Sequence, residues 1–167
     1  MAQLNHDIPG DETHPIDVAE AVAARRAWDF ARLADDQIAM TVEGLWRIYA
    51  LTLAWSERDE VLRLICSFDL DPPQARMGAL HEVLNLANDA VWEGGFSFWA
   101  QHRQMVWRYG LVLAGQAAAA PEQVDRMIRS AIANSERFYP AFQLACRCEI
   151  EPREAMGVAI AEPAGLA

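Results

Sequence analysis

The period at which apolar residues recur changes along the chain and divides it into helical and extended segments. Residues 1–13 mix proline, glycine and acids without any period, so we expect a mobile arm there. From residue 14 the pattern becomes helical, because Ile16, Ala19 and Val22 recur at three-residue steps. A proline is tolerated in a first helical turn. The pattern therefore predicts a helix from Pro15 to about Arg26.

Short segments with strand character follow this helix. In one of them Ile38, Met40 and Val42 alternate with polar residues, which indicates one buried face and one wet face. The segment 45–55 instead carries apolar residues on both sides, so we expect a central strand that is covered on both faces. The segments with strand character are 28–33, 37–43, 45–55, 61–68, 96–100 and 104–113.

Further helices are expected between and after these strands. Asp71 precedes two prolines, the order of a side-chain cap and a first helical turn, and apolar residues recur from there to Val91. We expect this helix to be the longest element and to end at Gly94-Gly95. A third helix is predicted from Pro121, broken or kinked by Pro140 and continuing to about residue 145, with a short helix over 152–160.

The order of these elements predicts the fold class. One helix precedes about five strands, a long helix interrupts them, and helices close the chain, so strands and helices do not alternate as in a parallel doubly wound sheet. We expect an α+β fold, an antiparallel sheet of about five strands with helices packed on it. The expected organisation is a single domain over 14–161, with the mobile arm at 1–13 and a C-terminal tail at 162–167.

Charge narrows the classes of partner. Fourteen basic and twenty-four acidic residues give a formal net charge of −10, which repels phosphate backbones and anionic lipid headgroups. We therefore expect neither nucleic acid nor membrane as a partner; the charge either attracts a cationic protein surface or serves colloidal stability. The N-terminus lacks the features of a secretory signal, and no segment is apolar enough to span a membrane, so a cytoplasmic location is expected.

The residue types that carry most enzyme chemistry are scattered. The four histidines are isolated in sequence, and the three cysteines, Cys66, Cys146 and Cys148, offer neither a disulfide framework nor the spacing of a closed zinc site. No phosphate-binding glycine loop or hydrolase signature is present. We expect no catalytic residue, no metal and no cofactor, although a carboxylate pair for acid–base chemistry stays an open alternative.

Aromatic residues are the most unusual feature of the composition. Most of them should lie in the core and between helices and sheet. The segments 45–55 and 96–100 have apolar residues on both faces, however, and one layer of helices covers only one face of a sheet. Exposed aromatic residues and a homodimer or partner contact are therefore expected.

Three segments carry a resemblance to a known family. They are Leu45-Trp46-Arg47 through Trp55, the run from Val91-Trp92-Glu93-Gly94-Gly95 to Trp99 after Leu84-Asn85, and Tyr139-Pro140-Ala141-Phe142-Gln143. Over about residues 14–160 the chain resembles the YbjN family of bacterial proteins. The resemblance implies a fold similar to type III secretion chaperones, which commonly dimerise and bind extended protein segments, and a general role as a sensory transduction regulator. It implies no catalytic residues.

The leading hypothesis is a non-enzymatic protein-binding or regulatory protein, chaperone-like in fold, which forms a homodimer or holds a protein client. Its partner-binding residues are predicted to be Trp46, Ile48, Trp92, Phe96 and Trp99, because aromatic anchors carry much of the energy of interfaces. One alternative is an enzyme or small-ligand-binding protein with a pocket between sheet and helix that uses scattered acids with Arg103 or Arg108. Another is a structural subunit that binds only itself.

Overall fold

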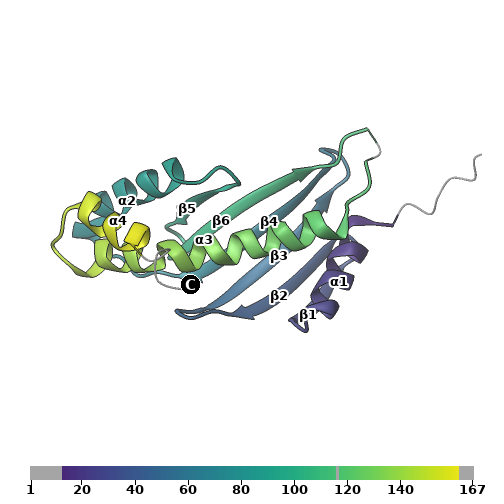
Figure 1. The fold of residues 1–167 in the computed structure, drawn as a ribbon, viewed down its shortest axis with the longest axis horizontal. Helices are drawn as coiled ribbons and strands as arrows, with labels where there is room; N and C mark the ends of the chain where they lie inside the picture. The colour runs from purple at the N-terminus through teal and green to yellow at the C-terminus, as the bar shows by residue number, and fades with distance from the viewer. Residues whose placement is uncertain (1–12, 116, 162–167) are drawn as a thin grey trace, which may run out of the picture.

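The computed structural model describes residues 13–115 and 117–161 and shows a sheet with helices on one of its faces (Figure 1). The expected N-terminal arm, apart from residue 13, and the expected tail at 162–167 lie outside the described residues. The α+β prediction is confirmed, and the antiparallel sheet has six strands where about five were expected.

The sheet is nearly a simple meander. Its strands lie in the order β1-β2-β3-β4-β6-β5, and every neighbouring pair is antiparallel. Their bounds are β1 Asp29–Ala34, β2 Gln37–Glu43, β3 Ile48–Ser56, β4 Val61–Asp69, β5 Gly95–Trp99 and β6 Gln104–Val112. The third strand thus begins three residues later than predicted, and residues 45–47 belong to the turn before it.

The helices are α1 Pro15–Arg25, α2 Met77–Asp89 after a 3-10 turn Gln74–Arg76, α3 Pro121–Arg147 and α4 Pro152–Ala161. Three predictions about them are corrected, namely the longest element, the break at Pro140 and the cap of α2. The longest element is α3, with 27 residues against 13 in α2, and α3 continues through Pro140 without a break. The predicted cap Asp71 lies before the 3-10 turn, and no side chain caps α2.

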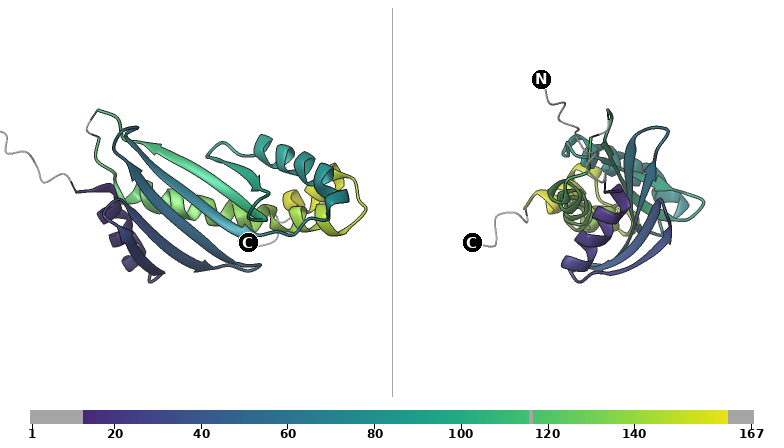
Figure 2. Two further views of the ribbon diagram at one scale, coloured as in Figure 1. Left: turned by 180° about the vertical axis from the view of Figure 1, so that it is seen from behind. Right: turned by 90° about the vertical axis from the view of Figure 1, so that its right-hand side faces the viewer.

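The core lies between the sheet and α3, which runs along one face of the sheet (Figures 1 and 2). Alternate residues of neighbouring strands share this face; Leu51, Cys66 and Trp107 form one such row across β3, β4 and β6. From α3, Phe138 and Phe142 pack on the sheet side chains, and both are fully buried. Burying a large apolar side chain stabilises the fold by about 1.5–3 kcal/mol, so this layer holds helix and sheet together.

The opposite face of the sheet, here called the open face, carries no helix (Figure 2). The prediction that β3 is covered on both faces is therefore wrong. Tyr49, Leu51 and Leu53 are buried under α3, whereas Ile48 on the open face is 67% exposed. Several other open-face residues of β1 to β4 are small, namely Ala31, Ala39, Thr41, Ala50, Thr52, Ala54 and Ser67, and they lie beside larger ones such as Arg63 and Ile65.

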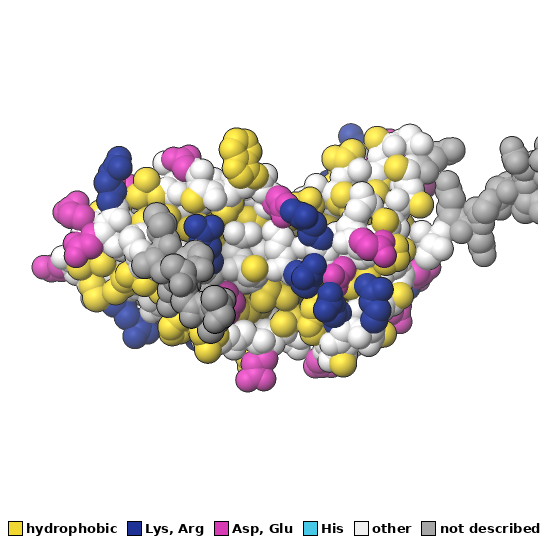
Figure 3. Space-filling model, viewed as in Figure 1, with side chains coloured by type: hydrophobic (Ala, Val, Ile, Leu, Met, Phe, Trp, Pro, Cys, Tyr) yellow, Lys and Arg dark blue, Asp and Glu magenta, His cyan; other side chains and the backbone are white. Residues whose placement is uncertain are grey.

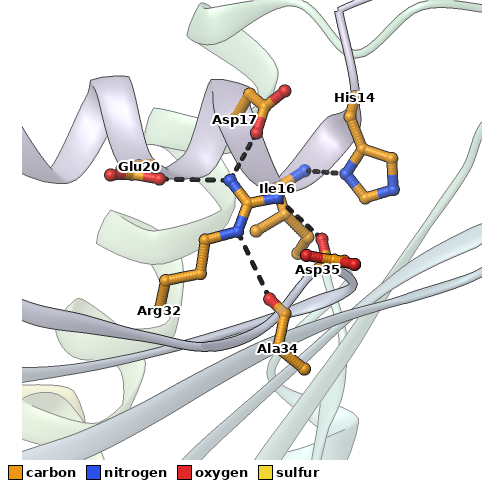
Figure 4. A network of polar contacts seen from close by, with 7 residues as sticks. All are labelled: His14, Ile16, Asp17, Glu20, Arg32, Ala34 and Asp35. Atoms are coloured by element: carbon orange, nitrogen blue, oxygen red, sulfur yellow. Dashed lines mark hydrogen bonds and ion pairs between the residues drawn. The ribbon is translucent and has the colours of Figure 1, made fainter.

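Ion pairs attach α1 to its neighbours. Figure 4 shows Arg32 of β1 turned toward α1, where its guanidinium pairs with Asp17 and with Glu20 at 3.2 Å. The same side chain donates to the carbonyl oxygens of Ala34 at 3.3 Å and Asp35 at 2.7 Å. The edge strand β1 thus carries a charged side chain that points inward under α1.

A second ion-pair group joins α1 to α3. Asp125 of α3 is 6% exposed and accepts two hydrogen bonds of 2.7 Å from Arg26, at the end of α1, and one of 3.0 Å from Arg129. The hydrogen bonds from Arg26 hold the pKa of Asp125 below its usual value against the opposing effect of burial. Figure 3 shows basic and acidic side chains mixed over this part of the helix face. None of the described helices is both long and apolar enough to cross a membrane.

Candidate interaction site

The turn between β2 and β3 exposes a group of apolar side chains. Leu45 is 80% exposed, Trp46 42% and Ile48 67%. They border an open hollow of about 480 Å³ whose other lining residues are Glu43, Gly44, Arg47 and Asp69. The turn therefore presents apolar surface to solvent beside charged groups. We call Leu45, Trp46 and Ile48 the apolar turn.

A carboxylate from α3 holds this turn in place. Glu136 accepts hydrogen bonds from the backbone N–H of Leu45 at 2.9 Å and of Trp46 at 3.3 Å. It also accepts one from the Tyr49 hydroxyl at 2.5 Å. One side chain thus satisfies two donors of the turn and one donor of the core, so the apolar turn has a defined conformation.

Gly44 is required by how closely α3 approaches the turn. A Cβ atom at this position would overlap the Glu136 carboxylate and would lie 2.5 Å from the Tyr49 ring. The backbone of Gly44 is also tied across the turn, because its N–H donates to the carbonyl oxygen of Arg47 at 2.8 Å. Any larger residue would push the turn away from Glu136.

Tyr139, one turn further along α3, supports the exposed tryptophan. Its ring stacks on Trp46 at a centroid distance of 6.2 Å and an interplanar angle of 23°. Its hydroxyl accepts hydrogen bonds of 2.8 Å from Arg47 and from Gln143. The indole of Trp46 therefore stacks on Tyr139, and the exposed 42% of the residue is available for a contact.

The environment of Tyr49 fixes its protonation state. Burial raises the pKa of its hydroxyl far above the ordinary value, and the hydrogen bond and negative charge of Glu136 raise it further. The hydroxyl is therefore a hydrogen-bond donor at any physiological pH. A neutral donor facing a carboxylate is a positioning contact.

The other three predicted site residues lie elsewhere. Trp92, in the loop between α2 and β5, is 99% exposed, and Trp99 is half-buried at the end of β5. Phe96 is only 3% exposed and packs between Trp107 and α3. It therefore belongs to the core, and its prediction as a partner-binding surface residue is wrong. Strands β4 and β6 separate β5 from β3, so the sheet does not bring Trp92 and Trp46 together.

Groups suited to catalysis are dispersed as well. Arg103 pairs with Asp71 at the turn before β6, whereas Arg108 projects from the open face. Burial raises the pKa of the Cys66 thiol to about 12 and that of Cys146 to about 11, which keeps both protonated. Among the described residues, no group of three histidine, cysteine, aspartate or glutamate side chains is arranged to hold a metal ion.

The sequence reasoning found Trp46 and Ile48 but missed the residues that hold them. Glu136, Tyr139 and Gly44 act across about 90 residues of chain, and nothing near Glu136 distinguishes it from the other acids. The one local signal was Gly44 between two strand patterns, which marks a turn without revealing what approaches it.

Comparison with known proteins gives a family. The model of the YbjN family, described as "Putative bacterial sensory transduction regulator", matches residues 15–144, from the start of α1 into the last turns of α3. No curated protein and no solved structure matches the chain.

Proposed function

The chain belongs to the YbjN family, and from this premise we propose that it is a non-enzymatic regulator that acts by binding another protein in the cytoplasm. The observation that carries the proposal is the apolar turn, in which Leu45, Trp46 and Ile48 are exposed together. An exposed apolar side chain alone is ordinary, but a held group of three beside charged residues is typical of a protein contact.

The way the turn is held supports a binding role. Glu136 and Tyr139 fix its backbone and the Trp46 ring before any partner arrives. Binding to a surface that is already ordered avoids much of the entropy cost of immobilising side chains. A chaperone-like action on an extended client is the finer form of this proposal, in line with the fold resemblance seen in the sequence.

The test is affinity purification from native cells at low salt with three baits. The baits are the wild type, a Leu45→Ser/Ile48→Ser variant, and Trp92→Ala as a matched control that removes an exposed apolar side chain from another loop. We expect a stoichiometric partner on the wild type and on Trp92→Ala, with at least tenfold less on the turn variant. Binding is then repeated with the two purified proteins. Recovery of the bait alone, or equal recovery on all three baits, contradicts the proposal.

Self-association is the second candidate, and the open face favours it. Small side chains line the middle of the face on β2 and β3. The face carries Asp29 and Glu43 at one end and Arg63 and Arg108 at the other. Six strands at about 4.8 Å spacing give a face wide enough for roughly the 800 Å² per partner of a standard interface. Light scattering over a hundredfold range of concentration measures the mass. Ala50→Glu, at the centre of the face, should lower the mass of a homodimer to that of one chain; an unchanged mass contradicts this candidate.

A further inference from the structure

The outer edges of the sheet differ in how they are protected from pairing with another strand. At β1, the inward charge of Arg32 and an irregular register between Arg32 and Ala34 hinder the pairing of another strand. At β5, the side-chain amide of Asn88 accepts from the N–H of Phe96 at 2.6 Å and donates to its carbonyl oxygen at 3.1 Å. Asn88 thus occupies the outer edge of β5 in place of a further strand.

The outer edge of β6 is longer than the strand that pairs with it. β5 covers the outer side of β6 only from Gln104 to Arg108, so residues 109–112 of β6 pair with β4 but have no strand on their outer side (Figure 1). Gly110 is exposed there, and Val112 is 64% exposed. Figure 3 shows the outline of the molecule indented along this edge.

The direction of the backbone groups on this edge follows from the alternation of an antiparallel ladder. The N–H and carbonyl of Phe96 point outward to Asn88, so Gly95 and Ser97 face β6, where they lie opposite Arg108 and Val106. On the other side of β6, Leu113 donates to the carbonyl of Glu60 at 2.8 Å, so the odd-numbered residues face β4. The N–H and carbonyl groups of Gly110 and Val112 therefore point outward, and no described residue bonds to them.

A cationic side chain, Arg108, lies at the end of this free edge where β5 begins. Arg108 is exposed and forms no ion pair with any described residue. It borders an open hollow of about 480 Å³ that is also lined by Gly94, Gly95 and Gly110. Arg63, opposite Gly110 on the open face, adds positive charge, although it pairs with Asp59. A strand added in line with β5 must stop at Gly94-Gly95, because β5 begins there.

We propose that the free edge of β6 at Gly110–Val112 binds the extended C-terminal end of a partner protein by strand addition, with its terminal carboxylate at Arg108. This inference deepens the proposed function and rests on it. The added strand pairs with the outward N–H and carbonyl groups, and its chain end lies where β5 begins. Its negative charge there meets the Arg108 guanidinium, which pairs with no acid among the described residues.

The test uses three acetylated peptides that end in Thr-Val-Thr-Val and the full chain, with binding followed by fluorescence anisotropy. The first peptide has a free C-terminus, the second is amidated, and the third is amidated with Glu as its last residue. We expect the free acid to bind at least fivefold more tightly than either amidated peptide. If the Glu peptide binds as well as the free acid, an acidic side chain is the ligand and the assignment to a chain end is overturned. No binding of the free acid overturns the whole inference.

Protein variants separate strand addition from other modes. Val112→Pro removes one outward N–H without touching the bonds to β4, and Val112→Thr keeps both the shape and the N–H. We expect Val112→Pro to weaken the free-acid peptide at least fivefold and Val112→Thr to bind like the wild type. Arg108→Gln should abolish the difference between free acid and amide, and circular dichroism checks that each variant is folded. Equal binding to all variants overturns the inference, while a partner that depends on the apolar turn leaves the proposed function standing.

Discussion

Removing the Glu136 carboxylate should destabilise the protein through one buried hydroxyl. The Tyr49 hydroxyl is fully buried and donates to Glu136 at 2.5 Å, so Glu136→Ala leaves a buried donor without its partner, at a cost of about 1–3 kcal/mol. The N–H groups of Leu45 and Trp46 lie at the exposed turn and can bond to water, so they add little. We expect a loss of about 2 kcal/mol, which lowers Tm by roughly 4–8 °C for a chain of this size.

Urea unfolding followed by circular dichroism measures this loss, and a double-mutant cycle with Tyr49→Phe isolates the contact. In the Tyr49→Phe background, Glu136→Ala should cost much less, and the coupling should be about 1.5–3 kcal/mol, as for hydrogen bonds to a charged group. Glu82→Ala, at an exposed position of α2, is the matched control and should stay within about 0.5 kcal/mol of the wild type. A coupling near zero, or a Glu136→Ala variant as stable as the control, would refute the reasoning.

Three further predictions concern Asp125, the cysteines and Asn88. Asp125 has a lowered pKa in the folded state, so its contribution to the free energy of unfolding is present above about pH 4 and is lost as the pH falls through that folded-state pKa. The urea midpoint of Asp125→Asn should therefore change less between pH 5 and 2.5 than that of the wild type. Equal changes in the two midpoints would contradict this. At pH 8 a thiol reagent should label Cys148 quickly, and Cys66 and Cys146 only after unfolding, so fast labelling of all three argues against their burial. Asn88→Ala should lower the free energy of unfolding by about 1–2 kcal/mol, because two Phe96 backbone groups lose their partner; a change below 0.5 kcal/mol, measured by urea unfolding, would show that water replaces the amide.

Much of the fold could be predicted because its elements have local signals. The alternation in β2 and the helical steps of α1 arise from which side chains face the core, and the sequence displays both directly. The errors have physical causes as well. Pro140 looks like a break, yet the packing of Phe138 and Phe142 on the sheet continues α3 through it. The start of β3 was misplaced because the apolar turn continues the apolar pattern of the strand.

The candidate site was less accessible to sequence reasoning. Aromatic composition drew attention to Trp46 and to Phe96 alike, but one lies at a turn and the other under α3, and only the tertiary structure separates them. Glu136 reaches its partners from the other end of the chain. The open edge of β6 depends on the shortness of β5 and on the direction of individual amide groups, which no pattern of residue types records.

The position of α3 after the whole sheet has a consequence for how the chain leaves the ribosome. The sheet is complete at Val112, but the helix that covers it ends at Arg147, 35 residues later. At about 5–20 residues per second, translation leaves the sheet without its cover for roughly two to seven seconds. During that interval the nascent chain displays an apolar face that the finished protein never shows, and a chain terminated before Pro121 would display it permanently. Premature termination there should yield an insoluble product, whereas loss of the residues after α4 should not.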